Sequence, residues 1–285
     1  MSRSAASRAA VCACLIALLA YRFSGVPALI VAAALLPALA YATLIARIDH
    51  GPPTLAAIMF LWGAGAAALL SQAANDMAQA WLAAMQDPES ARALTPQLAA
   101  PAIEEVIKAA PLAALMMLRR GGEPVLDGIV YGALIGVGFA LAENADYYVL
   151  AAVQGGEPGL LQSIYLRGVL GGLNHAAFTA SVGAALGWGV LRGGRWLWSA
   201  PLLGLALAIA QHVIWNALAA GPLNALACNA SAPGGACNPP ASAAALFVVA
   251  PLIVLTCIGP ALLVLALAVR RALRREQQLT ARHPA

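Results

Sequence analysis

Long apolar runs, separated by short polar or turn-forming stretches, make up most of the chain. A membrane span needs about 20 apolar residues, and runs close to that length recur along the sequence. The pattern predicts an all-α fold, a polytopic transmembrane helix bundle of about eight spans. The predicted spans cover approximately residues 9–24, 27–46, 54–72, 99–118, 128–150, 166–190, 200–220 and 243–269.

The first of these runs is the weakest span. Only 13 uncharged residues separate Arg8 from Arg22, so a signal peptide is an alternative interpretation. Because no clear small-x-small cleavage site follows the run, we interpret it as a helix whose Arg22 side chain extends to the membrane interface.

Composition agrees with a membrane protein. Hydrophobic residues make up 62% of the chain and charged residues 10%, whereas a soluble domain carries about 25% charged residues. The formal net charge of +4 comes from short loops and tails rather than from a basic domain. The sequence therefore gives no indication of a nucleic-acid-binding surface.

The distribution of basic residues predicts the orientation. The tail at residues 270–275, RRALRR, is expected in the cytoplasm. Alternating eight spans from that end places both termini inside, with 12 basic residues on the inner side and 3 on the outer side. We expect a multi-pass protein of a bacterial-type cytoplasmic (inner) membrane.

Three parts are predicted along the chain. Residues 1–98 form N-terminal transmembrane helices and an outer interfacial segment, residues 99–220 form a four-helix membrane core, and residues 221–285 form an outer loop, the last helix and a basic tail. Cys228 and Cys237 lie in that outer loop. Either a disulfide in an oxidising compartment or two unpaired thiols fits their spacing.

Two further patterns concern packing. The outer stretch 73–98 is interpreted as a connector rather than as a flap that faces substrate. Gly128, Gly132 and Gly136 recur every four residues in the fifth span. This small-xxx-small pattern allows helix backbones to approach closely and predicts a tightly packed bundle core.

Ionisable residues interrupt the fourth span. Such residues are costly inside a membrane and indicate a functional site. Lys108, the only lysine of the chain, follows Glu104 by four residues and Glu105 by three, so it can form a structural ion pair with either carboxylate. The other glutamate then has no obvious partner on its own helix.

The next three spans contribute Glu143, His175, His212 and Asn216, of which the last two share a helix face. With a rise of 1.5 Å per residue, the two glutamates of the fourth span lie about 8–9 Å below its outer end, Glu143 about 10 Å, and the histidines about 12–14 Å. A common depth on four helices predicts one site in the outer half of the membrane.

Two carboxylates and two histidines suit the activation of water. Without a metal, a glutamate would take a proton from water, and a histidine with Asn216 would donate hydrogen bonds to the oxyanion. With zinc, the candidate ligands are His175, His212, Glu143 and Glu104, with one position open for water. The chain has no HExxH motif, which weakens the zinc interpretation, and both mechanisms remain open.

The same residues resemble the PrsW family of intramembrane proteases. The pattern EExxK, FxxxE, a helix with His, and HxxxN occurs in that order as EEVIK, FALAE, His175 and HVIWN, over roughly residues 100–220. That family is related to the CAAX-protease and bacteriocin-processing membrane superfamily, whose second motif more often ends in His than in Glu.

The resemblance implies an intramembrane endopeptidase that cleaves a membrane-anchored protein near the outer face of the membrane. It implies that Glu104 or Glu105 is catalytic and that Lys108 holds the other glutamate. It further implies that Glu143 and His175 help to hold water or metal, and that His212 and Asn216 lie near the oxyanion.

The resemblance leaves the cofactor open and suggests a partner. The family is described both as metal-dependent and as glutamic-type, so one zinc ion is a possible cofactor. The association of PrsW-like proteases with site-1 cleavage makes a single-span anti-sigma factor the implied partner.

Two other functions compete with proteolysis. A proton-coupled transporter would use the Glu, Lys and His residues as a relay, and it predicts polar residues through the inner half of the spans. A non-catalytic scaffold would use them only to join helices. The inner halves of these spans are nearly bare of ionisable groups, which favours the protease.

Overall fold

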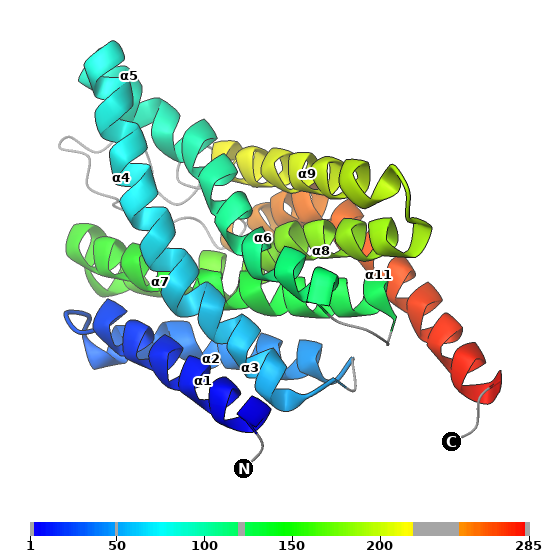
Figure 1. Ribbon diagram of the computed structural model, residues 1–285. Helices are drawn as coiled ribbons and strands as arrows, with labels where there is room; N and C mark the ends of the chain where they lie inside the picture. Colours follow the sequence, from blue (N-terminus) through cyan, green and yellow to red (C-terminus); the bar gives the residue numbers. More distant parts are fainter. Residues whose placement is uncertain (1–2, 49–50, 119–122, 219–244, 283–285) are drawn as a thin grey trace.

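The computed structural model describes residues 3–48, 51–118, 123–218 and 245–282, and within these ranges the chain is helical without strands. Figure 1 shows long helices packed side by side. In chain order the elements are α1 (Arg3–Arg22), α2 (Ala28–Ala46), α3 (Pro53–Leu61), η1 (Trp62–Ala67), α4 (Ala68–Met85), α5 (Pro88–Leu94), η2 (Thr95–Ala99), α6 (Ala100–Leu118), α7 (Pro124–Ser163), η3 (Ile164–Leu170), α8 (Asn174–Arg192), α9 (Trp196–Leu218), η5 (Ala245–Val249) and α11 (Ala250–Arg282), where η denotes a π-helical turn.

The all-helical membrane architecture predicted from the apolar runs is confirmed. Among the described residues, five helical segments are long and apolar enough to cross a membrane: 28–46, 53–85, 124–192, 196–217 and 246–275. The segment 124–192 contains two of the predicted spans, whereas α1 and the charged helix α6 are not among the five. The count of eight spans and the cytoplasmic position of both termini stay predictions. Cys228 and Cys237 lie outside the described residues.

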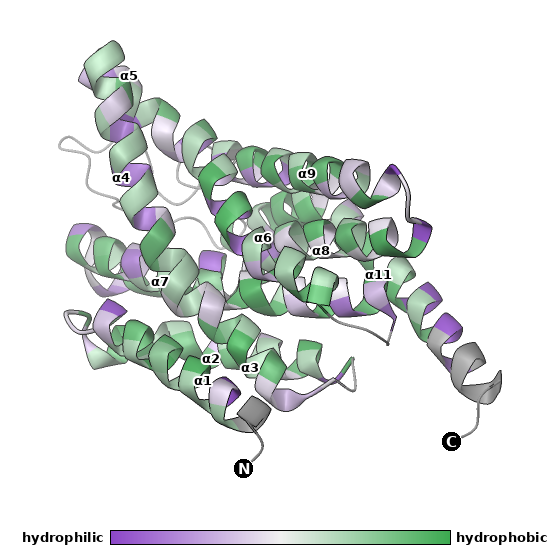
Figure 2. Ribbon diagram, viewed as in Figure 1, coloured by the Kyte–Doolittle hydropathy of each residue, from purple (hydrophilic) through white to green (hydrophobic). Residues whose placement is uncertain are grey.

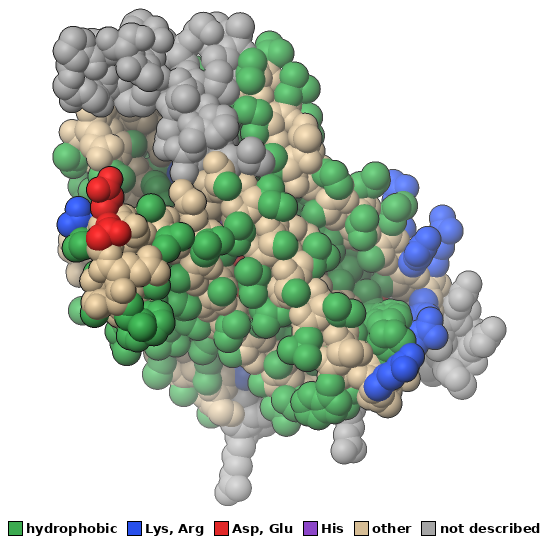
Figure 3. Space-filling view, turned by 90° about the horizontal axis from the view of Figure 1, so that it is seen from above, with side chains coloured by type: hydrophobic (Ala, Val, Ile, Leu, Met, Phe, Trp, Pro, Cys, Tyr) green, Lys and Arg blue, Asp and Glu red, His purple; other side chains and the backbone are tan. Residues whose placement is uncertain are grey.

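Apolar side chains cover much of the outside of the bundle. Figure 2 shows hydrophobic residues along most helices, with hydrophilic ones on the upper part of α4 and on the part of α11 just before its grey end. The side chains of Arg270, Arg271, Arg274 and Arg275 are exposed at that end. In the space-filling view from above, Lys and Arg side chains gather on one side of the molecule (Figure 3).

Helix α7 lies at the centre of the bundle, where it contacts α8 on one side and α2, α3 and η1 on another. The predicted glycine stripe lies against α8, because a Cβ atom on Gly128, Gly132 or Gly136 would come within 2.0, 2.6 or 2.1 Å of a backbone oxygen of that helix. Only residues without a side chain permit such an approach. The predicted close packing at these glycines is therefore confirmed.

The glycine contacts also fix the register between α7 and α8. Gly128 meets Gly183 and Gly136 meets the carbonyl oxygen of His175, so the two helices run antiparallel. The start of α8 is thereby placed beside the middle of α7. The π-helical turn η2 directly precedes α6, and η3 ends shortly before α8 begins; such wide turns often occur at functional sites.

We predict that Gly136→Ala destabilises the folded protein, because its methyl group would overlap the carbonyl of His175, and overpacking costs about 1–3 kcal/mol. Gly259→Ala is the matched control, since Gly259 lies in α11 and no atom of the described residues comes within 4 Å of the added Cβ. The check is the midpoint of thermal unfolding in detergent. Equal midpoints for the two variants would contradict the predicted packing.

Candidate functional site

Glu105 and Lys108 form the buried centre of the polar cluster. Both side chains have 0% exposed surface, and Lys108 Nζ lies 2.7 Å from Glu105 Oε1. The same oxygen lies 3.0 Å from His212 Nδ1, and Thr179 Oγ1 donates a hydrogen bond of 3.2 Å to Glu105 Oε2. Of the two adjacent glutamates, Glu105 is thus the one that Lys108 holds directly.

Glu104 has a different environment. Its Oε1 accepts a hydrogen bond of 3.2 Å from Asn75 Nδ2 on α4. Its Oε2 is buried and accepts no hydrogen bond from the described residues. Two nitrogens of the cluster, Lys108 Nζ and His212 Nε2, each lie 3.8 Å from this oxygen.

His175 connects the ion pair on α6 to Glu143 on α7. Lys108 Nζ lies 3.2 Å from His175 Nδ1, and His175 Nε2 lies 2.7 Å from Glu143 Oε2. Because a lysine ammonium only donates, we assign Nδ1 as the acceptor and Nε2 as the protonated nitrogen, which donates to Glu143. The histidine is therefore held on both sides.

The hydrogen bond to His212 assigns a second tautomer. Glu105 is paired with Lys108 and so acts as a carboxylate acceptor. In the neutral imidazole, His212 Nδ1 then carries the proton, and Nε2, which lies on the side of Glu104, has the lone pair. A carboxylate that fixes one imidazole nitrogen in this way is common behind metal-binding histidines.

Arg167 is a member of the cluster that the sequence interpretation missed. Its Nη2 donates to Glu143 Oε2 over 3.0 Å, and its Nε donates to Asn144 Oδ1 over 3.1 Å. The guanidinium also lies 3.6 Å from the ring centre of Tyr147. In the sequence, the only sign of this role was the position of Arg167 at the start of the predicted span 166–190. Arg167 was instead one of the three basic residues assigned to the outer side.

The predicted site residue Asn216 and the acidic residue Asp146 lie beside the cluster rather than within it. Asn216 Nδ2 donates to the carbonyl oxygen of Pro96 over 2.9 Å, although it shares a helix with His212. Asp146 forms an ion pair with Arg22, and its side chain is about half exposed. The Arg22 side chain therefore has a partner on α7.

A cavity of about 360 Å³ opens beside the cluster. Glu104, Glu143, Asp146 and Asn216 all contribute to its wall. The outer segment 73–98, interpreted as a connector, also borders this cavity. The complete lining is Arg22, Ala68, Ser71, Gln72, Asn75, Asp76, Gln79, Arg92, Thr95, Pro96, Ala100, Glu104, Phe139, Glu143, Asp146, Tyr147 and Asn216.

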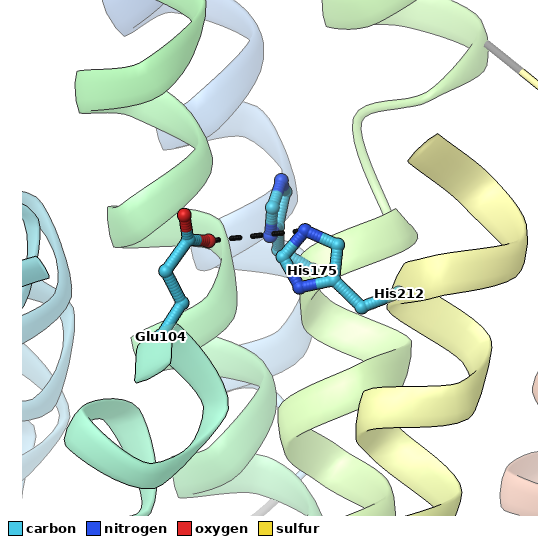
Figure 4. A group of neighbouring side chains, drawn as sticks. All are labelled: Glu104, His175 and His212. Carbon is cyan, nitrogen blue, oxygen red and sulfur yellow. Dashed lines mark ion pairs between the residues drawn. The ribbon is translucent and has the colours of Figure 1, made fainter. Parts of the chain in front are cut away.

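Three side chains of the cluster have the donor atoms of a metal site. Glu104, His175 and His212 each offer one ligand atom, and these atoms lie within 4.8 Å of one another. Figure 4 shows the carboxylate and the two imidazole rings converging from three helices. Two His nitrogens and one carboxylate oxygen form a common catalytic zinc ligand set. The unpartnered Glu104 Oε2 and the lone pair of His212 Nε2 fit such an ion, whereas His175 Nε2 would have to give up its bond to Glu143.

Residues 51–256 match the family model for PrsW family intramembrane metalloproteases. The chain belongs to the PrsW family. Curated proteins and solved structures provide no match. The matched range includes every residue of the polar cluster, so membership in this protease family agrees with the motif-based resemblance. PrsW membership implies a membrane protein that acts on membrane-anchored substrates.

We predict that Arg167→Met lowers the kcat for cleavage of a single-span model substrate by roughly tenfold with little change in KM, because residues that orient ligands and carboxylates typically contribute at that level. Arg167→Lys should recover part of the loss, since it restores one donor to Glu143. The control is Arg195→Met, in the turn between α8 and α9, at the end of each helix opposite to its cluster histidine. An unchanged kcat in Arg167→Met would exclude this orienting role.

Proposed function

We propose that this PrsW family member is an endopeptidase that hydrolyses a peptide bond of a membrane-anchored protein near the outer face of the membrane. The observation that carries the proposal is Glu104 Oε2, a buried carboxylate oxygen at the wall of the cavity that has no hydrogen-bond donor among the residues that the structure describes. A catalytic base must lie within hydrogen-bond reach of the water that it deprotonates, and this oxygen has a free position for that water.

The two adjacent glutamates have separate tasks in this proposal. Both carboxylate oxygens of Glu105 already accept hydrogen bonds, which come from Lys108, His212 and Thr179. Glu105 therefore orients His212 rather than binding water. Glu104 accepts the proton of the attacking water at Oε2. His212 Nε2 lies 3.8 Å from Glu104 Oε2, beside the position of the attacking water. His212 and Asn216 remain the predicted oxyanion donors.

The PrsW family description as metalloproteases favours a bound ion. Glu104, His175 and His212 would hold it, and zinc in such a site supplies Lewis acidity and lowers the pKa of water. In that case Glu104 contributes an oxygen ligand, and Glu143 is the other glutamate of the cluster that lies at the cavity wall. Glu104 is essential to either form of the mechanism.

The substrate class and membrane follow from the family resemblance. We propose a single-span anti-sigma factor as the substrate, cleaved at site 1 on the outer side of a bacterial cytoplasmic membrane. Membership of a protease family favours this function over the transporter alternative.

We expect Glu104→Gln to reduce cleavage of a single-span substrate by more than about 100-fold, because Gln cannot accept the proton. Its unfolding midpoint should stay close to that of the wild type, since the amide oxygen can still accept from Asn75. Glu157→Gln, at an exposed position of α7, is the control. Full cleavage by Glu104→Gln would refute the assignment.

We expect Glu105→Ala to lose both activity and stability. Removing one partner of a buried ion pair costs about 3–5 kcal/mol, because it leaves the other charge uncompensated. Thermal unfolding and cleavage measured on the same purified sample separate this variant from Glu104→Gln. A Glu105→Ala protein with unchanged stability would contradict the buried pairing with Lys108.

The metal is tested on purified wild-type protein. Zinc content is measured by elemental analysis, and cleavage is assayed with and without a membrane-permeant chelator. Stoichiometric zinc and chelator-sensitive cleavage, both lost in His212→Ala, would support the metal form. Metal-free cleavage that still requires Glu104 would support the glutamate-driven form.

A further inference from the structure

The polar residues of α4 lie on one face of this helix. They occupy an arc of about 140° at 100° per residue, and they line the cavity beside Glu104: Ser71, Gln72, Asn75, Asp76 and Gln79. On the opposite side of the helix, Leu70, Met77 and Trp81 are 52%, 73% and 62% exposed. Helix α4 therefore presents an apolar face outward and a polar face to the cavity.

Two atoms of this polar face have unused hydrogen-bonding capacity. Ser71 is 1% exposed, and its hydroxyl oxygen has no partner among the described residues. Asn75 donates to Glu104 through Nδ2, but its Oδ1 has no partner in the part of the chain that the structure describes. An unsatisfied buried polar atom costs about 1–3 kcal/mol, so its presence at a cavity wall indicates a ligand that supplies the missing bond.

A membrane-spanning substrate would bring such a ligand. Peptide bonds in a transmembrane helix are hydrogen-bonded internally. Hydrolysis requires access to one carbonyl carbon, so the helix must unwind locally and release its backbone N–H and C=O groups. These groups cost several kcal/mol each in an apolar surrounding. The protease must therefore provide replacement partners next to its catalytic carboxylate.

We propose that the polar face of α4 binds the unwound backbone of the substrate through Ser71 and Asn75, immediately beside Glu104. The inference rests on the proposed peptidase function and identifies the wall that holds the scissile segment. Asn75 joins this wall to the site, because the same side chain donates to Glu104 and leaves Oδ1 for a substrate N–H. Gln72 and Gln79 extend the hydrogen-bonding surface along the cavity.

The kinetic test uses Ser71→Ala, which removes the unpartnered hydroxyl without touching Glu104. We expect KM for a single-span substrate to rise about three- to tenfold, the effect of one lost hydrogen bond, with kcat unchanged. The unfolding midpoint of the free protein should stay the same or increase, because a hydroxyl with no partner is removed. A residue with a purely structural role would instead lower the midpoint and leave KM unchanged. Met77→Ala is the matched control on the outward face.

The binding test does not depend on cleavage. A photo-crosslinking amino acid is placed at Gln72 or Gln79 in the Glu104→Gln background, with Met77 as the control position. We expect crosslinks to a single-span substrate from positions 72 and 79 and much weaker ones from position 77. Equal crosslinking from all three positions would overturn the proposal.

The two tests separate this inference from the proposed function. If the wild type cleaves the substrate while Ser71→Ala keeps its KM and positions 72 and 79 do not crosslink, the α4 surface is refuted and the protease assignment stands. If positions 72 and 79 crosslink but the wild type cleaves no substrate, the binding surface stands and the peptidase function is refuted.

Discussion

The ion pair between Glu105 and Lys108 has no exposed surface, and the arrangement around it follows from this burial. Charges removed from water require close partners for each remaining donor and acceptor. Thr179 and His212 provide them for the carboxylate, and His175 and the face of Phe139, 3.9 Å from Nζ, provide them for the ammonium. These partners come from α7, α8 and α9, so one pair on α6 joins the four helices of the core.

Helix geometry then gives the neighbouring glutamate a different task. Consecutive residues point about 100° apart on an α-helix, so Glu104 faces the cavity when Glu105 faces the core. The motif EExxK thereby combines a carboxylate fixed by Lys108 and His212 with a second one whose Oε2 has no hydrogen-bond partner among the described residues and lies at the cavity wall. Because both carboxylates lie in a site of low dielectric, electrostatic interactions between them and their partners are stronger than they would be in water.

Backbone packing makes the distances of the site possible. The glycines of α7 bring its axis so close to α8 that His175 reaches Glu143 with a contact of 2.7 Å. The π-helical turn η3 returns the chain to α7 and places Arg167 on the same carboxylate. On the other side, α3 and η1 continue into α4, whose polar face closes the cavity beside α6. Tight packing and an adjacent polar cavity are thus features of the same few helices.

The sequence by itself determined the helical membrane class, the order of the motifs and the set of side chains that are too polar for lipid, because these depend on local periodicity and on the cost of burying charge. It also restricted the partners of Lys108 to two glutamates, since both follow from i,i+3 and i,i+4 spacing. Only the tertiary structure decided that Glu105 is the directly paired residue, that Asn216 contacts Pro96, and that Arg167, Asn75 and Ser71 reach the site. Those contacts join residues far apart in the chain, and their distances depend on how closely whole helices approach, which no local pattern encodes.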